Sequence, residues 1–230
     1  MSGLAKDVGL GARALMGALV ESIWRADQKV PLSDLTIAEF DSGLAGLYQH
    51  LYDQQVLCEA RCSACGEPFE FRLDLKEFEL RIWSNAKDFE GLHWEKVKAP
   101  SGRILKLPRL KDLNATDEAA QREWIKACLL KGEFDFDAIQ SEIELAAPIL
   151  SQDINTTCPE CRANNKVRFD MARYLMDSLA AETAFLWREV HLIAKTYHWS
   201  LPDILDLTRD VRRQMVGFIV SERPRVRAVS

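Results

Sequence analysis

Two pairs of cysteines have the spacing of metal-binding turns. Cys62 and Cys65 form one CxxC pair, and Cys158 and Cys161 form the other. Small or turn-forming residues lie between and after the sulfurs, as in tight turns that present both side chains in one direction. Four cysteine thiolates in two such turns are the ligand set of a structural zinc site. We therefore predict that these four residues bind one Zn²⁺ ion.

The distance between the two pairs along the chain is unusual. Cys65 and Cys158 are 93 positions apart, whereas an ordinary zinc ribbon closes within roughly 15 to 20 residues. A site built from both pairs would be a split zinc ribbon with a long insertion. Zinc held by four thiolates has no open coordination position, so we expect it to support structure and not to activate water.

The remaining cysteines and histidines favour packing over chemistry. Cys58 and Cys62 are four residues apart, and as a ligand pair this spacing fits an extended strand poorly and leaves Cys65 unexplained, so we predict that Cys58 packs in the core. Cys128 lies on the apolar side of a predicted helix. His191 and His198 are two helical turns apart on a mostly apolar face, where packing is the usual role of a histidine. No HExxH, GxSxG, phosphate-loop or dinucleotide motif is present in the sequence. We therefore expect the protein not to be an enzyme.

The composition narrows the class of protein. The chain has 230 residues, of which 47% are hydrophobic and 28% charged, enough for a substantial core. Six cysteines are too few for a secreted disulfide framework and suit reduced thiolates, so we expect a cytoplasmic protein. No segment reaches the roughly 18 uninterrupted apolar residues of a membrane span. The formal net charge of −5 disfavours nonspecific binding to nucleic acid.

Strands are expected to position the cysteines. After the first pair, Phe69, Phe71, Leu73 and Leu75 alternate with charged residues, which is typical of a half-buried strand. Residues 166–169 are predicted to form the strand that leaves the second pair. Each pair would then lie at the tip of a hairpin, and the two hairpins would lie side by side.

The second turn lacks the glycine that usually follows such a pair. Gly66 follows the first pair, but Arg162, Ala163 and Asn164 follow the second. Glycine adopts a left-handed backbone at no steric cost, and asparagine tolerates it better than most residues. We therefore expect Asn164 to supply the left-handed turn.

Helices are predicted before, between and after the cysteine pairs. Thr36 and Glu39 form a capping-box signature that opens a helix to about Leu51. The insertion should contain a hairpin with strands at 92–98 and 103–107, a helix over 114–132 that stops at Gly132, and a helix over about 135–150. An earlier amphipathic helix is predicted from the spacing of Met16, Leu19, Val20, Ile23 and Trp24.

The pattern after residue 170 is entirely helical. Ser200 and Thr208 are predicted to cap a short helix and the last helix. The helix before them should be well buried because two neighbouring stripes are apolar: Leu186, Val190, Ile193 and Tyr197, and Trp187, His191, Ala194 and His198.

Together these elements predict an α+β fold in one compact unit over residues 1–230. The expected subregions are N-terminal helices at 1–53, a split four-cysteine zinc ribbon at 54–75 and 151–169, a mixed hairpin and helical insertion at 76–150, C-terminal helices at 170–222 and a tail at 223–230.

Several motifs occur in a fixed order along most of the chain. They are CSACGE at 62–67, FEF at 69–71, RILKLP at 103–108, CLL at 128–130, CPEC at 158–161, FD at 169–170, WREVHLIA at 187–194, YHWS at 197–200, DILDL at 203–207 and RR at 212–213. In this order the chain resembles the T4-type phage baseplate protein family, also called baseplate hub assembly chaperones, of contractile tails and related contractile injection systems. The stretch after residue 187 is the most specific part of the resemblance.

The resemblance implies a noncatalytic role in building the baseplate hub, or in forming part of it, through contacts with hub or spike proteins. It places the protein in the cytoplasm of the producing bacterial cell and leaves open whether it stays in the finished particle. Its oligomeric state is also open. We further hypothesise that Arg209, Arg212 and Arg213 form a partner-binding surface.

Two other classes of function remain open. A zinc-ribbon nucleic-acid-binding protein would need basic and aromatic groups on the ribbon, but the strand after the first pair mixes acidic residues with Arg72 and Lys76. A thiol oxidoreductase would form reversible disulfides and hold no stoichiometric metal.

Overall fold

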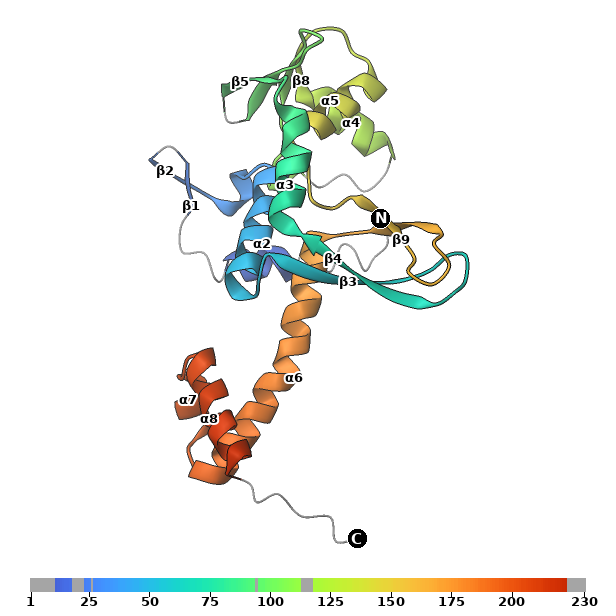
Figure 1. Ribbon diagram of the computed structural model, residues 1–230. Coiled ribbons are helices and arrows are strands. Elements are labelled where there is room, and N and C mark those ends of the chain that lie inside the picture. The colour runs from blue at the N-terminus through green and yellow to red at the C-terminus, as the bar shows by residue number, and fades with distance from the viewer. Residues whose placement is uncertain (1–10, 18–22, 26, 94, 113–117, 223–230) are drawn as a thin grey trace. The chain divides into compact units, whose positions relative to one another are not determined.

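The computed structural model describes residues 11–17, 23–25, 27–93, 95–112 and 118–222. The chain divides into two compact units, residues 1–175 and 176–230, where the sequence predicted one (Figure 1). We call them unit 1 and unit 2. The division arises because the residues of unit 2 have a hydrophobic core of their own, around Val190, Ile193, Ile204 and Ile219. The tail expected at 223–230 lies outside the described residues.

Unit 1 combines helices with antiparallel sheets, which confirms the predicted α+β class. Among the described residues, three sheets are two-stranded: β1 (Ile23–Arg25) with β2 (Gln28–Val30), β3 (Gln55–Arg61) with β4 (Pro68–Asp74), and β9 (Asp153–Thr157) with β10 (Asn164–Arg168). The fourth sheet has the order β5 (Glu90–His93), β6 (Lys96–Lys98), β7 (Ile104–Lys106) and β8 (Leu129–Lys131).

Helix α2 (Ile37–Leu51) confirms the predicted capping box. The Glu39 N–H donates to the Thr36 hydroxyl at 3.2 Å, and the Thr36 N–H donates to the Glu39 carboxylate at 2.8 Å. These bonds satisfy two backbone donors that a helix start leaves free. Helix α3 (Leu75–Trp83) follows β4 without a loop, because the Asp74 carboxylate caps it by accepting the Glu77 N–H at 2.9 Å.

The helix predicted near the N-terminus is wrong in its second half. Residues 11–17 are helical, but Ile23 lies in β1, where it pairs with Val30. Leu19 and Val20 lie outside the described residues. Asp27 adopts φ 64°, a left-handed conformation that aspartate tolerates in tight turns. This turn lets β2 fold back on β1, so pairing replaces the helix.

The insertion contains the predicted hairpin, with two further strands. Helix α4 (Glu118–Cys128) ends before Leu129, and β8 pairs with β7 instead of continuing the helix to Gly132 as predicted. The available edge of the hairpin decides this, since tertiary pairing overrides helix propensity. Gly132 therefore follows a strand, with φ 120°, and a Cβ there would lie 2.9 Å from the Arg103 side chain. Helix α5 (Phe136–Ala146) follows.

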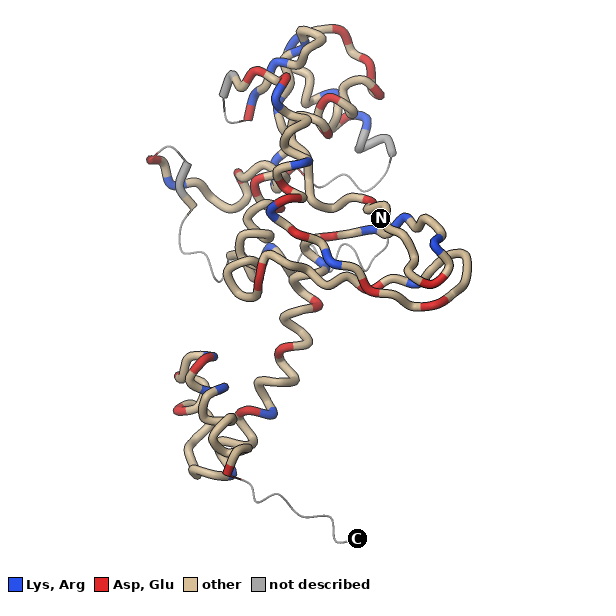
Figure 2. Tube along the Cα trace, viewed as in Figure 1, with Lys and Arg blue, Asp and Glu red and all other residues tan. Residues whose placement is uncertain are grey.

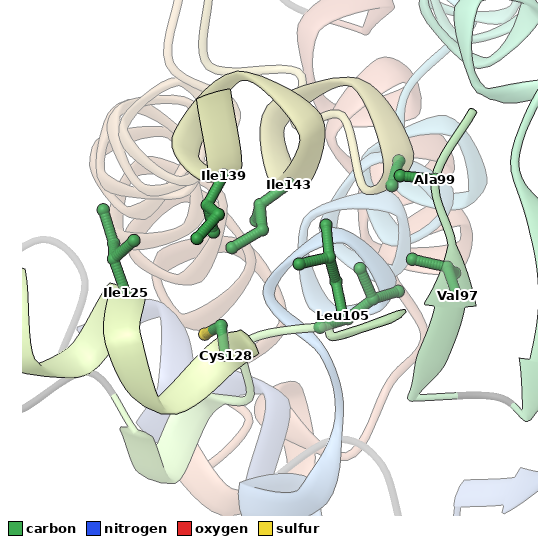
Figure 3. Packing of buried hydrophobic residues seen from close by; sticks show 9 residues of the cluster. Val97, Ala99, Leu105, Ile125, Cys128, Ile139 and Ile143 are labelled. Atoms are coloured by element: carbon green, nitrogen blue, oxygen red, sulfur yellow. The ribbon is translucent and has the colours of Figure 1, made fainter. Parts of the chain in front are cut away.

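Hydrophobic side chains from two strands and two helices form the core of the insertion (Figure 3). Cys128 is 5% exposed within it, which confirms its predicted packing role. The side chains that Figure 3 labels come from β6, β7, α4 and α5 and from the residue after β6: Val97, Ala99, Leu105, Ile125, Cys128, Ile139 and Ile143.

Unit 2 contains the later part of α6 (Met171–Tyr197), α7 (Leu201–Leu205) and α8 (Arg209–Ser221), which pack together (Figure 1). The predicted caps are confirmed, because the Ser200 and Thr208 side chains accept the N–H groups of residues 203 and 211. The prediction of a well-buried α6 is wrong for one stripe and for the end of the other, where Tyr197 is 37% exposed. Trp187 is 54% exposed, and His191 and His198 are exposed, so the histidines do not have the packing role predicted for them.

In the described part of the chain, no helix is long and apolar enough to cross a membrane.

Candidate metal centre

The four cysteine sulfurs lie together at the tips of two hairpins that Figure 1 shows side by side. All four Sγ atoms are within 4.8 Å of one another, with 3.5 Å between Cys62 and Cys161 and 3.9 Å between Cys65 and Cys158. These distances exceed the roughly 2.05 Å of a disulfide. A tetrahedron with metal–sulfur bonds of about 2.3 Å has sulfur–sulfur edges of about 3.8 Å. The cluster could therefore hold a metal ion.

The two turns have the same backbone hydrogen bonds. The Cys62 N–H donates to the carbonyl five residues later at 2.9 Å, and the N–H four residues later donates to the Cys62 carbonyl at 3.0 Å. Around Cys158 the same two bonds are both 3.0 Å. In each turn the first cysteine is buried and the second is exposed. The turns therefore present one buried and one accessible sulfur each.

The left-handed residue of the second turn is Arg162 and not Asn164, contrary to our prediction. Gly66 has φ 76° and Arg162 has φ 60°, each four residues after the first cysteine of its pair. Asn164 is already in β10 and pairs with Thr157. The closing hydrogen bond fixes which position must be left-handed, and the residue there adopts that conformation even when it is not glycine.

The close approach of four sulfurs opposes the ionisation of neighbouring thiols. The backbone N–H groups of Cys65 and Ala64 lower the pKa of Cys62 to about 6. The Glu67 N–H lowers the pKa of Cys65, but loss of hydration and the three neighbouring sulfurs outweigh it and raise that pKa to about 12. Like charges this close disfavour one another, and a bound cation removes the conflict.

A buried amide, Asn165, connects the two turns and was missed in the sequence. The side chain of Asn165 is 6% exposed. Its Oδ1 accepts the Ser63 N–H at 2.8 Å and the Ser63 hydroxyl at 3.0 Å. Its Nδ2 donates to the Ala163 carbonyl at 2.9 Å and to the Cys62 sulfur at 3.6 Å. The available signal was an asparagine at an inward position of a strand, where β-branched residues are favoured.

Apolar groups cover one side of the cluster. Phe69 is 6% exposed and packs with Cys62 and Cys158, with Ala60 and Phe71 partly buried around them. Cys65 and Cys161 face solvent. An ion could therefore enter from the side of the exposed sulfurs.

No protein-family model, curated protein or solved structure matches this chain. The resemblance to baseplate proteins stays a prediction that rests on the sequence motifs.

The remaining two cysteines lie outside the cluster. Burial raises the pKa of Cys58 and of Cys128 to about 11, so both thiols stay protonated at neutral pH. Both are buried, in agreement with the packing role predicted for them. Among the described residues, the four-cysteine cluster is the one group of three or more potential metal ligands.

The three arginines predicted to bind a partner are all in ion pairs within unit 2. Arg212 Nε lies 3.3 Å from Glu189, and Arg213 Nη2 lies 3.1 Å from Glu182. Arg209 also pairs with Glu182. These pairs join α8 to α6, and the Arg212 side chain is only 14% exposed. Partner binding by these residues stays a prediction, for which Arg213, 50% exposed, is the most accessible.

Proposed function

We propose that the four cysteines bind one structural Zn²⁺ ion, and that the protein is a noncatalytic assembly factor or structural component of the baseplate hub of a contractile phage tail or related injection system. The observation that carries the metal proposal is the cluster of four sulfurs from turns far apart in the sequence.

The chemistry of the ligands favours a single zinc ion. Thiolates are soft ligands, and a tetrahedral four-sulfur site suits zinc or a lone iron. Edges of 3.5 and 3.9 Å leave room for one metal atom, whereas an iron–sulfur cluster needs a wider cage. Because all four positions would be taken by protein sulfurs, the site has a structural role and the outer surface carries the function.

Support for a role in protein contacts comes from unit 2. Phe185 is 60% exposed, Phe218 59% and Trp187 54%, with Trp199 and Val220 also exposed. Exposed aromatic groups are effective anchors for partner proteins. They lie in or near the stretch in which the resemblance to baseplate proteins is most specific.

The proposal is tested by co-purification of the tagged, full-length protein with the hub and spike proteins of the contractile particle encoded in the same genome. We expect a stable complex, and we expect Phe185→Ser with Phe218→Ser to abolish it while zinc content is unchanged. Leu80→Ser is the matched control, because Leu80 is an equally exposed apolar residue (66%) in unit 1. A genome without such genes, or hub and spike proteins that never co-purify, would contradict the proposal.

The alternative, a zinc-ribbon nucleic-acid-binding protein, is less well supported. Acidic and basic residues intermingle along both hairpins (Figure 2). Asp153 pairs with Lys166 at 3.0 Å and with Arg168 at 3.6 Å, which offsets the basic groups of β10. A mobility-shift assay with DNA and RNA separates the two: we expect no binding, and affinity that falls steeply with salt would favour the alternative.

A further inference from the structure

We propose that Asn165 is the positioning residue of the metal centre: its amide joins the two cysteine turns and holds the Cys62 thiolate in place for the ion. This inference rests on the proposed metal site and deepens it. It assigns a role to a residue that is neither a ligand nor part of a cysteine motif.

The amide oxygen bridges segments that are distant in sequence. Asn165 is in β10, whereas Ser63 is in the turn after β3, 102 positions earlier. Two hydrogen bonds from Ser63, at 2.8 and 3.0 Å, end on the same oxygen. They fix the first turn against the second hairpin without any contribution from a metal. The bridge therefore prepares the arrangement of turns that a bound ion needs.

The amide nitrogen acts on the ligand itself. One of its hydrogens goes to the Ala163 carbonyl at 2.9 Å and the other to the Cys62 sulfur at 3.6 Å. Sulfur accepts hydrogen bonds at longer distances than oxygen does, and a donor at a thiolate spreads its negative charge. The amide oxygen therefore accepts hydrogen bonds while the amide nitrogen donates them. This pattern fixes which way the amide faces, because a flipped amide would direct its N–H groups at the Ser63 N–H. Partners of this kind orient metal ligands and strengthen metal binding.

The side-chain hydrogen bond to a cysteine sulfur differs between the two turns. Asn165 comes seven residues after Cys158, and the residue seven after Cys62 is Phe69, whose side chain has no hydrogen-bond donor. Cys62 receives the Asn165 amide and also the Ala64 N–H, at 3.4 Å. Cys62 should therefore be the least reactive thiolate of the bound site, although Cys158, at 0% exposure, is buried at least as deeply.

Variants at two adjacent asparagines test the role. Asn165→Ala removes both functions of the amide, and Asn165→Asp keeps its shape but replaces the donor with a negative charge. Asn164→Asp is the matched control, because Asn164 is exposed and is the next residue in β10. We expect both Asn165 variants to bind zinc about 10- to 100-fold more weakly, the range typical for such partners, and to release it faster to a chelator. In the Co²⁺-substituted protein we expect a shifted sulfur-to-metal charge-transfer band. The control should match the wild type in both.

A second measurement does not depend on the folding of a variant. In the metal-loaded wild-type protein, limited alkylation followed by mass spectrometry should label Cys65 and Cys161 first, then Cys158, and Cys62 last. If Cys62 reacts before Cys158, the proposed hydrogen-bond support is contradicted.

The outcomes separate this inference from the proposed function. A wild-type protein without bound metal defeats the metal proposal itself. A wild-type protein that binds metal, together with Asn165 variants that keep wild-type release rates and an unshifted Co²⁺ spectrum, defeats only the role of Asn165.

Discussion

The two cysteine turns have one backbone design but are built from different residues. Both close with the same pair of hydrogen bonds, and both bury the first sulfur and expose the second. Where one has Gly66 the other has Arg162, and where one has Phe69 the other has Asn165. The backbone hydrogen bonds and the spacing of the sulfurs thus set the conformation of each turn. The neighbouring residues differ in backbone strain and in the hydrogen bonds that they give to the cysteine sulfurs.

The two hairpins also differ in how they are held. A backbone bond closes the base of each, from Leu75 to Gln54 at 2.9 Å and from Phe169 to Gln152 at 2.8 Å. The first hairpin continues directly into α3. The approach to the second depends on a distant side chain, since Asp41 of α2 accepts the Leu150 N–H. A distant side chain also contacts the first hairpin, because the Tyr174 hydroxyl of α6 donates to the Leu57 carbonyl of β3.

Removing a buried cysteine of the proposed metal site should have the largest effect and should separate the hairpins. Cys158→Ser leaves three sulfurs, and we expect loss of the metal and of much of its binding free energy, which is on the order of 10 to 16 kcal/mol for structural zinc. Native mass spectrometry measures the metal, and limited proteolysis measures the opening of the hairpins. Cys128→Ala is the control, because it removes a buried cysteine outside the cluster and should keep one metal per chain. Full metal occupancy in Cys158→Ser would contradict the ligand assignment.

A pH titration of Asp41→Asn tests the tertiary attachment of the second hairpin. Burial raises the pKa of Asp41 from 3.8 to about 6; hydrogen bonds from the backbone at Leu150 and Ser151 oppose the rise, and Asp170 and Glu79 add to it. The folded state thus binds the proton more tightly than the unfolded chain does. The stability from this group is fully present below about pH 4 and is lost as the pH rises to about 6.

The difference in unfolding free energy between wild type and Asp41→Asn should therefore change by roughly 3 kcal/mol across that window, with the wild type losing stability relative to the variant as the pH rises. Comparing the two proteins at each pH cancels the shared effect of acid on the cysteines. Urea unfolding at several pH values gives the difference, and parallel pH profiles would show that Asp41 does not titrate in this range.

Exchanging the left-handed residues should give the smallest effects, of opposite sign in the two turns. Gly66→Ala should destabilise the metal-loaded protein by about 1 kcal/mol, because a Cβ disfavours positive φ. Open space surrounds that position, so the backbone alone sets the effect. Arg162→Gly should stabilise by up to about 1 kcal/mol by relieving the same strain, less the entropy that glycine adds to the unfolded chain. Thermal unfolding measures both, and equal signs would show that the turns are not equivalent.

Most features set by local sequence were predicted, and among features set by distant partners only the grouping of the four cysteines was predicted, from their paired spacing. Alternation around Phe69 and the Thr36 capping box depend on neighbours a few residues away, and both are confirmed. Strand β8 forms because β7 offers an edge, and β1 forms because β2 folds back on it, so helical spacing misled in both places. Asn165 is missed for the same reason, since its partner Ser63 is in another hairpin.

The most direct test is zinc K-edge X-ray absorption, together with metal analysis, on the purified, reduced, full-length protein. We expect one zinc per chain with four sulfur neighbours at about 2.3 Å and no nitrogen or oxygen ligand. A folded protein with no stoichiometric metal, or a zinc ion with a nitrogen or oxygen ligand, would contradict a closed four-sulfur centre that joins the two hairpins.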